Sequence, residues 1–146
     1  MQKVQILLKR PLNEVLRVTE KNPYFIQEWG YQAWKLSVES TINLVAVKKA
    51  SEGSIKRLDQ NFFRARFDRL TPKEREYLRA MAELGSGAHR SGDIADMLDQ
   101  EVQRAAPIRN NLIKKGMIYS PAHGDTEFAV PLFVGFMKRI MPTFSR

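Results

Sequence analysis

The four residues Thr71-Pro72-Lys73-Glu74 constrain the fold of this chain most tightly, because together they specify the start of a helix. Thr71 is suited to cap the helix, and Pro72 fits the first helical position, where a backbone N–H has no partner to lose. Glu74 stands three residues after the cap and can bond back to it. Gly85, a residue suited to a left-handed terminus, ends the same segment. The sequence therefore predicts a domain boundary at Thr71.

Three helices are predicted after this boundary, the first of which ends at Gly85. A turn over residues 85–90 leads into a short second helix that either Ser91 or Asp93 caps. The third helix starts near Gln103 and runs to Lys115. We expect Pro107 to lie in its first turn, because an interior proline removes a hydrogen bond and clashes with the preceding turn.

A β-hairpin is predicted directly after the third helix. Residues 117–119 form a short apolar strand, and residues 126–129 alternate as its partner. A last helix spans Leu132 to Ile140 and stops before Pro142. Three helices followed by a β-hairpin are typical of a winged helix-turn-helix, so the expected fold class is mainly α with a small β-hairpin wing.

Upstream of the boundary the pattern is helical throughout, which predicts a helical bundle. Asn22 and Pro23 separate two helices between Asn13 and Leu36 as cap and first-turn proline. Further helices are expected over about 42–50 and 54–70. Aromatic residues on the second helix would suit base stacking, but their spacing is also that of a packed helix face, and core packing is favoured. These residues are Tyr24, Phe25, Trp29, Tyr31 and Trp34.

The composition excludes several classes of protein. The chain has no cysteine, which rules out disulfides, thiolate metal sites and cysteine nucleophiles. No apolar run reaches the roughly 18 to 20 residues that cross a bilayer, and Pro131 and Gly135 interrupt the longest one. The apolar run near the amino terminus is too short for a secretory signal. We therefore expect a cytoplasmic protein with no membrane partner.

No catalytic or metal-binding motif stands out. His89 and His123 are far apart, with no clustered ligands nearby to complete a zinc shell. Four carboxylates lack the residue order of a calcium loop, and helix capping and solvation explain them. They are Asp93, Asp96, Asp99 and Glu101. We expect no enzyme activity, no cofactor and no metal.

The formal net charge of +8 favours a polyanionic partner, and double-stranded DNA is the one we expect. The charge is uneven, because residues 1–70 carry a net +6 from 13 basic and 7 acidic residues, whereas residues 71–146 carry +2 from 11 and 9. The local pattern is more favourable, since the segment from Val102 to Gly116 has four positive residues and no acidic one. The DNA-binding prediction therefore rests on that segment.

Seven residues are predicted to contact DNA. If the third helix lies in the major groove, its polar residues face the bases, where arginine suits guanine and asparagine or glutamine suits adenine. Phosphate contacts are expected from the end of that helix and from the wing. The predicted base-facing residues are Gln103, Arg104, Arg109, Asn110 and Lys114, and the predicted phosphate contacts are Lys115 and His123.

The chain resembles the C-terminal region of prokaryotic AAA-type ATPases of the origin-recognition-like group. The resemblance is carried by Asn61–Gly85, Ala106–Arg109, Leu112–Tyr119 and Gly124–Leu132, and Pro23–Gly30 is similar to part of the helical lid of that group. It implies a lid-like subdomain over residues 1–70 and a winged helix over residues 71–146.

One motif of that group is absent, because no Gly-x-x-x-x-Gly-Lys-Ser/Thr phosphate-binding loop occurs in the sequence. Without it, the resemblance implies a fragment that neither holds ATP tightly nor hydrolyses it. Two functions stay open. The chain is either a DNA-binding module, or a docking module that holds a protein partner or an ATPase core supplied in trans.

Overall fold

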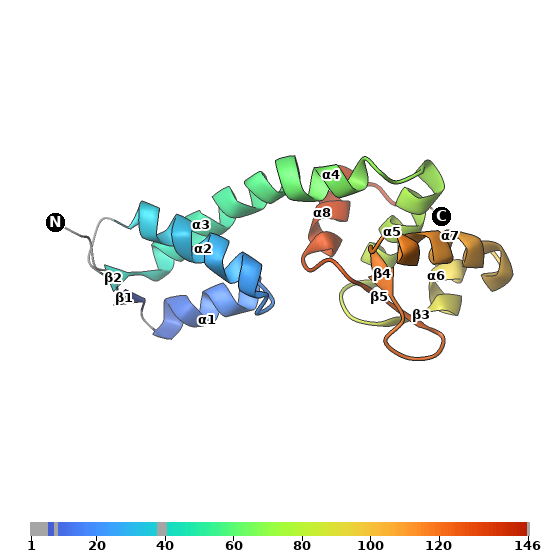
Figure 1. Cartoon of the computed structure of the whole chain (residues 1–146), viewed down its shortest axis with the longest axis horizontal. Coiled ribbons are helices and arrows are strands. Elements are labelled where there is room, and N and C mark those ends of the chain that lie inside the picture. Colours follow the sequence, from blue (N-terminus) through green and yellow to red (C-terminus); the bar gives the residue numbers. More distant parts are fainter. Residues whose placement is uncertain (1–5, 8, 38–40, 146) are drawn as a thin grey trace. The chain divides into compact units, whose positions relative to one another are not determined.

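The computed structural model describes residues 6–7, 9–37 and 41–145, and it is mainly helical (Figure 1). The chain divides into two compact units, residues 1–64 and residues 65–146. The division lies within a helical stretch, shortly before the boundary expected at Thr71. In the described part of the chain, no helix is long and apolar enough to cross a membrane.

The described residues of the first unit form three helices, a π-helical segment and a parallel pair of two-residue strands. Its elements are β1 (Ile6–Leu7), α1 (Lys9–Val18), α2 (Pro23–Leu36), β2 (Thr41–Ile42), α3 (Leu44–Arg57) and η1 (Leu58–Phe63). The short helix α4 (Arg64–Phe67) spans the division. The second unit contains α5 (Pro72–Leu84), β3 (His89–Arg90), α6 (Ser91–Met97), α7 (Val102–Lys114), β4 (Ile118–Tyr119), β5 (Asp125–Phe128) and α8 (Phe133–Ile140).

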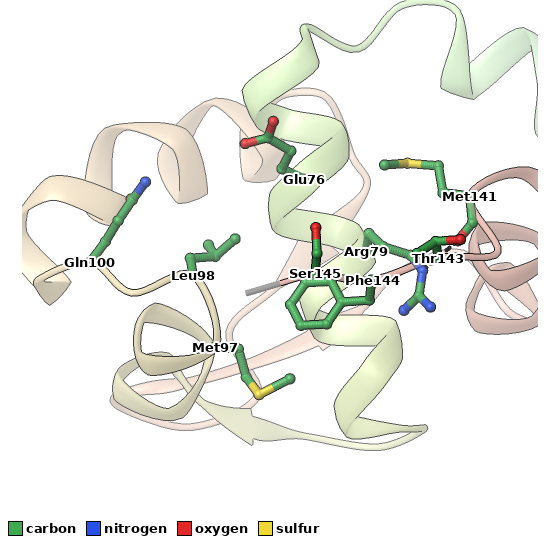
Figure 2. A pocket seen from close by; sticks show the side chains of 9 residues that line it. All are labelled: Glu76, Arg79, Met97, Leu98, Gln100, Met141, Thr143, Phe144 and Ser145. Atoms are coloured by element: carbon green, nitrogen blue, oxygen red, sulfur yellow. Dashed lines mark hydrogen bonds between the residues drawn. The ribbon is translucent and has the colours of Figure 1, made fainter.

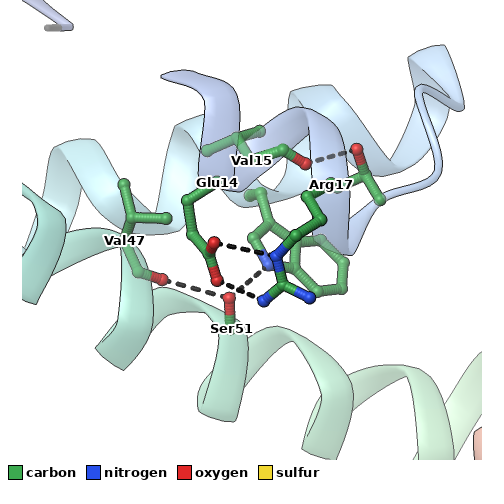
Figure 3. Close-up of polar contacts among 7 residues, drawn as sticks. Glu14, Val15, Arg17, Val47 and Ser51 are labelled. Atoms are coloured by element: carbon green, nitrogen blue, oxygen red, sulfur yellow. Dashed lines mark hydrogen bonds and ion pairs between the residues drawn. The ribbon is translucent and has the colours of Figure 1, made fainter. Parts of the chain in front are cut away.

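Helices α2 and α3 form the core of the first unit. As predicted, Asn22 caps α2 by accepting a hydrogen bond from the Phe25 backbone N–H, and Pro23 lies in the first turn. Trp29 is fully buried, and its indole N–H donates to the Ser51 hydroxyl at 2.7 Å. Ser51 in turn donates to the carbonyl of Val47 (Figure 3). The only polar atom of the tryptophan ring is thus satisfied inside the core.

The prediction of a helix break between residues 50 and 54 is wrong, because α3 runs unbroken through Gly53. The exposed Gly53 faces open space, and a glycine at such a position weakens a helix by about 1 kcal/mol without ending it. Ala50 and Ser54 lie on the buried face and keep the helix packed across this point. The parallel pairing of β1 with β2 was not predicted.

Helix α5 starts as the capping motif predicts. The Thr71 hydroxyl accepts from the Glu74 backbone N–H at 3.2 Å, and the Thr71 N–H donates to Glu74 Oε1 at 3.0 Å. The helix ends at Gly85, whose φ of 98° is readily available only to glycine. Helix α8 packs against α5, and together they bury the largest side chains of the second unit, which include Tyr77, Leu78, Met81, Phe133 and Phe136.

The second unit contains a three-stranded antiparallel sheet in the order β3-β5-β4. The β4–β5 hairpin confirms the predicted one, with Ile118 opposite Phe128. The strand β3 was predicted to be part of a turn. Its two residues are too few to show an alternating pattern, and only the pairing of His89 with Thr126 reveals it.

Two predicted details of α6 and α7 are wrong. Neither Ser91 nor Asp93 caps α6, because Arg90 occupies the cap position and the Ser91 hydroxyl is hydrogen-bonded to the Thr126 hydroxyl at 3.0 Å. Pro107 is the sixth residue of α7 and not part of its first turn. The proline lies on the exposed side of the helix, where water can satisfy the carbonyl that loses its partner.

An ion pair between the buried Glu74 and the exposed Lys115 connects the start of α5 with the end of α7. Glu74 Oε1 lies 2.5 Å from Lys115 Nζ and also accepts from the backbone of Thr71. Burial opposes the ionised carboxylate, but the hydrogen bonds from Lys115 and Thr71 outweigh it and lower the pKa of Glu74. One carboxylate therefore caps one helix and holds the end of another.

We predict that this carboxylate makes the stability of the chain sensitive to acid. Because the folded pKa of Glu74 is below its ordinary value, its contribution is present above the unfolded pKa of about 4.3 and is lost as pH falls through the folded pKa. Denaturant unfolding of the wild type and Glu74→Gln should differ most at neutral pH, with the variant less stable, and the difference should shrink below pH 4. A constant difference from pH 7 to pH 3 would contradict this account.

Candidate nucleic-acid interface

The outer face of α7 presents a polar stripe. Gln103, Asn110 and Lys114 are exposed and separated by seven and four residues, which places them on one side of the helix. The opposite side carries the buried Ala105 and Leu112. Packing therefore fixes which residues face outward, and the predicted positions 103, 110 and 114 are among them. Arg104 is also exposed and flanks this stripe.

Arg109 is placed differently from the stripe. Its side chain is half-buried, and its Nε–H donates to the Thr126 hydroxyl at 2.8 Å while Nη2 donates to the Asp125 carbonyl at 3.0 Å. Both partners belong to β5. The side chain therefore ties α7 to the sheet, and two of its donors are already in use.

Lys115 and His123 were both predicted to contact phosphate. Lys115 Nζ is bonded to Glu74 Oε1 and to the Arg69 carbonyl at 2.9 Å, so it has partners inside the unit. His123 is exposed in the β4–β5 loop, residues 120–124. Of these two side chains, His123 is therefore the one whose position leaves it accessible to a ligand.

Carboxylates gather near the start of α7. Asp93, Asp96 and Glu101 line a shallow hollow of about 720 Å³ together with Gln103 and His123. Their charge repels a polyanion at this end of the helix, whereas Lys114 attracts one at the other end. The charge along α7 is therefore mixed at its start, where Arg90 and Arg104 lie among the carboxylates, and positive at its end.

A buried polar cluster supports α7 from beneath. Thr126 is fully buried, and its hydroxyl meets both Arg109 and Ser91. Tyr77 lies beside them, and burial raises the pKa of its phenol, although the charge of Arg109 and the hydroxyl of Thr126 partly offset the effect. The cluster joins residues from α5, α6, α7 and β5, so it sets how the helix lies against the sheet.

A hollow of about 290 Å³ opens between α7 and the β4–β5 loop, and we call it the loop hollow. Its wall combines small apolar side chains of α7 with polar groups from α5, α6 and the loop. The residues that line it are Tyr77, Ser91, Val102, Ala105, Ala106, Arg109, Ser120, His123 and Gly124. None of these residues is acidic.

Another hollow, of about 320 Å³, lies beside α5 and the C-terminal residues (Figure 2). Arg79 is buried there, and it donates to the Met141 carbonyl at 2.6 Å and to Glu83 at 2.8 Å. Phe144 lies with its ring centre 5.5 Å from the guanidinium. The arginine thus holds the C-terminal segment against α5. Within the described ranges, no three His, Cys, Asp or Glu residues form a group that could hold a metal ion.

Comparison with known proteins identifies one family. A domain of unknown function, DUF8462, matches residues 60–137, which is more than half of the chain. The chain belongs to this family. No curated protein and no solved structure matches it.

The DUF8462 match contains every residue of the candidate interface. It begins within η1 and ends within α8, so it spans the polar stripe, the buried cluster and the loop hollow. The sequence analysis found the stripe but missed the roles of Tyr77, Ser91 and Thr126. One signal was available, because Thr126 and Phe128 alternate along a strand and share an inward face.

We predict that removing the Thr126 hydroxyl destabilises the DUF8462 region. Thr126→Val keeps the shape of the side chain but leaves the Arg109 Nε–H and the Ser91 hydroxyl without their shared partner. The free energy of unfolding should fall by about 1 to 3 kcal/mol. Chemical denaturation measures it, and the exposed Thr143→Val is the matched control, expected within about 0.5 kcal/mol of the wild type. Equal stability of the two variants would show that the cluster contributes little.

Proposed function

We propose that the chain is a non-catalytic module that binds double-stranded DNA, with its second unit acting as a winged helix-turn-helix. In this proposal α7 is the recognition helix and the β4–β5 hairpin is the wing. The observation that carries it is the outer stripe of α7, where Gln103, Asn110 and Lys114 are exposed together opposite the packed face. The element order and the small antiparallel sheet support it.

The side chains divide into two roles under this proposal. Gln103, Arg104 and Asn110 face base edges, and Lys114 and His123 meet phosphates, since amide and guanidinium groups match base edges and point charges suit phosphate. Arg109 and Lys115 already have internal partners. They therefore position the helix and do not read bases, and the base-reading face lies in the exposed remainder of the predicted set.

The resemblance to AAA-type ATPases supplies a setting for this function. We propose that the first unit is lid-like and that the chain works in the cytoplasm together with an AAA-type ATPase core. The absence of a phosphate-binding loop motif from the sequence supports a module without ATPase activity. In this setting the second unit holds the assembly on DNA.

We predict salt-sensitive DNA binding that depends on α7. Fluorescence anisotropy with a labelled duplex should show the binding constant falling by about 0.9 log units per phosphate contact for each log unit of salt. Arg104→Ala/Lys114→Ala removes two exposed cations from α7 and should weaken binding at low salt and flatten the salt dependence.

The matched control removes the same charge elsewhere. Lys73→Ala/Lys138→Ala takes two exposed lysines from α5 and α8 and should bind nearly as tightly as the wild type. If the two double variants lose affinity equally, attraction by net charge explains the binding and α7 is not the contact surface. Absence of binding at low salt would reject the DNA proposal.

A second candidate function is protein docking, and the first unit favours it. Most of the large apolar side chains that are exposed in the described part of the chain lie there: Leu12, Tyr24, Tyr31, Trp34, Leu36 and Val45. Tyr24, Tyr31 and Trp34 follow one side of α2 at spacings of seven and three residues. Clustered tyrosine and tryptophan side chains often dominate protein interfaces.

We predict that this aromatic stripe matters for docking and not for DNA binding. Tyr24→Ser/Tyr31→Ser should leave duplex binding unchanged, since neither residue belongs to the second unit. If docking operates, the variant should bind an AAA-type ATPase core that lacks its own lid at least tenfold more weakly than the wild type, measured by calorimetry. Equal binding of wild type and variant to that core would exclude the stripe as its docking surface.

A further inference from the structure

The loop hollow differs in charge from the other hollows of the second unit. Its lining contains a guanidinium from Arg109 and the imidazole of His123, and it contains no carboxylate. The hollow beside α5 includes Glu76 as well as Arg79, and the shallow hollow at the start of α7 includes three carboxylates as well as Arg90. The shallow hollow adjoins the loop hollow, since both are lined by Ser91, His123 and Gly124. An anion therefore meets an attractive wall in the loop hollow and acidic groups in the other two.

Arg109 adds a second argument. The side chain is half-buried, yet among the residues that the structure describes no carboxylate lies within ion-pair distance of it. Its hydrogen-bond partners, the Thr126 hydroxyl and the Asp125 carbonyl, are neutral. A partly desolvated cation without a counter-charge is costly, and a bound anion offsets that cost. Since guanidinium groups match phosphate oxygens in geometry, a phosphoryl group suits this place well.

We propose that the loop hollow is a phosphate-binding site. Arg109 supplies the charge, and Ser91 and His123 line the hollow as further polar groups. Gly124 also lines it, and its φ of 82° lets the backbone of the loop approach the ligand without a side chain in the way. The volume of about 290 Å³ suits inorganic phosphate or the phosphoryl end of a small ester.

The phosphate has two sources. One is the backbone of duplex DNA, because α7 and the β4–β5 loop line the hollow and are also the elements proposed to contact DNA. The other is a free phosphate monoester, which would bind between α7 and the β4–β5 loop. The first source rests on the proposed function, and the second does not.

The test is an NMR titration of the isotope-labelled chain with inorganic phosphate. Saturable shifts are expected at the guanidinium resonances of Arg109 and at the backbone amide of Gly124. Arg109→Met should weaken the binding about tenfold or more, because it removes a charge-assisted contact. Loss of one exposed lysine from α5, in Lys73→Ala, should leave the affinity unchanged.

Another variant protects the test against a folding defect, since Arg109 also supports the sheet. Ala106→Glu leaves Arg109 in place and adds a carboxylate to the wall of the hollow, where it should pair with the guanidinium and exclude phosphate. Circular dichroism and thermal unfolding of this variant check that it is folded before the titration. If phosphate causes no saturable shift at Arg109, or if Ala106→Glu binds phosphate as the wild type does, the proposal is overturned.

A titration with a short duplex separates the two sources. If DNA supplies the phosphate, the duplex shifts the same resonances, inorganic phosphate competes with it, and Ala106→Glu weakens duplex binding. If phosphate binds but the duplex leaves these resonances unshifted, a free phosphate ester is the ligand and the site stands. In the case where the duplex does not bind at all, the proposed function fails while the phosphate site is retained.

Discussion

The hydrogen bonds of Arg109 to β5 are the interaction on which the candidate interface depends. The contacts of the inner face of α7 decide which residues its outer face presents. Arg109 donates from the inner side to the Thr126 hydroxyl and to the carbonyl of Asp125. Thr126 also meets Ser91 at the start of α6. The buried Thr126 hydroxyl of β5 is thus hydrogen-bonded to residues of both α6 and α7. Rigid support of this kind lets exposed polar side chains present a fixed pattern to a partner.

In the second unit, the positions of the charged residues matter more for binding a polyanion than the net charge does. Asp93, Asp96 and Glu101 lie near the start of α7, whereas Lys114 lies at the end of the helix. Residues 71–146 carry a net charge of only +2, so a whole-chain charge is a poor guide to where a polyanion would bind. Local fields at short range decide the approach, because screening by salt removes most long-range attraction.

The elements with strong local signals could be predicted from the sequence, and those that depend on distant partners could not. The capping box at Thr71 and the cap at Asn22 are contained in adjacent residues, and both were found. The strand β3 exists only because β5 lies beside it. The partners of Arg109 and Lys115 likewise come from residues far along the chain, so only the exposed stripe of α7 could be read from periodicity.

Glu74 serves two structures at once, and this shared use has a kinetic consequence. Its Oε1 atom accepts from the backbone at the start of α5 and from Lys115 at the end of α7. If the first turn of α5 frays and turns its carboxylate to solvent, Lys115 at the end of α7 loses its charged partner and keeps only the Arg69 carbonyl, so opening at one helix end weakens the other. Amide hydrogens near both ends would then exchange through coupled openings, although they lie about forty residues apart in the chain.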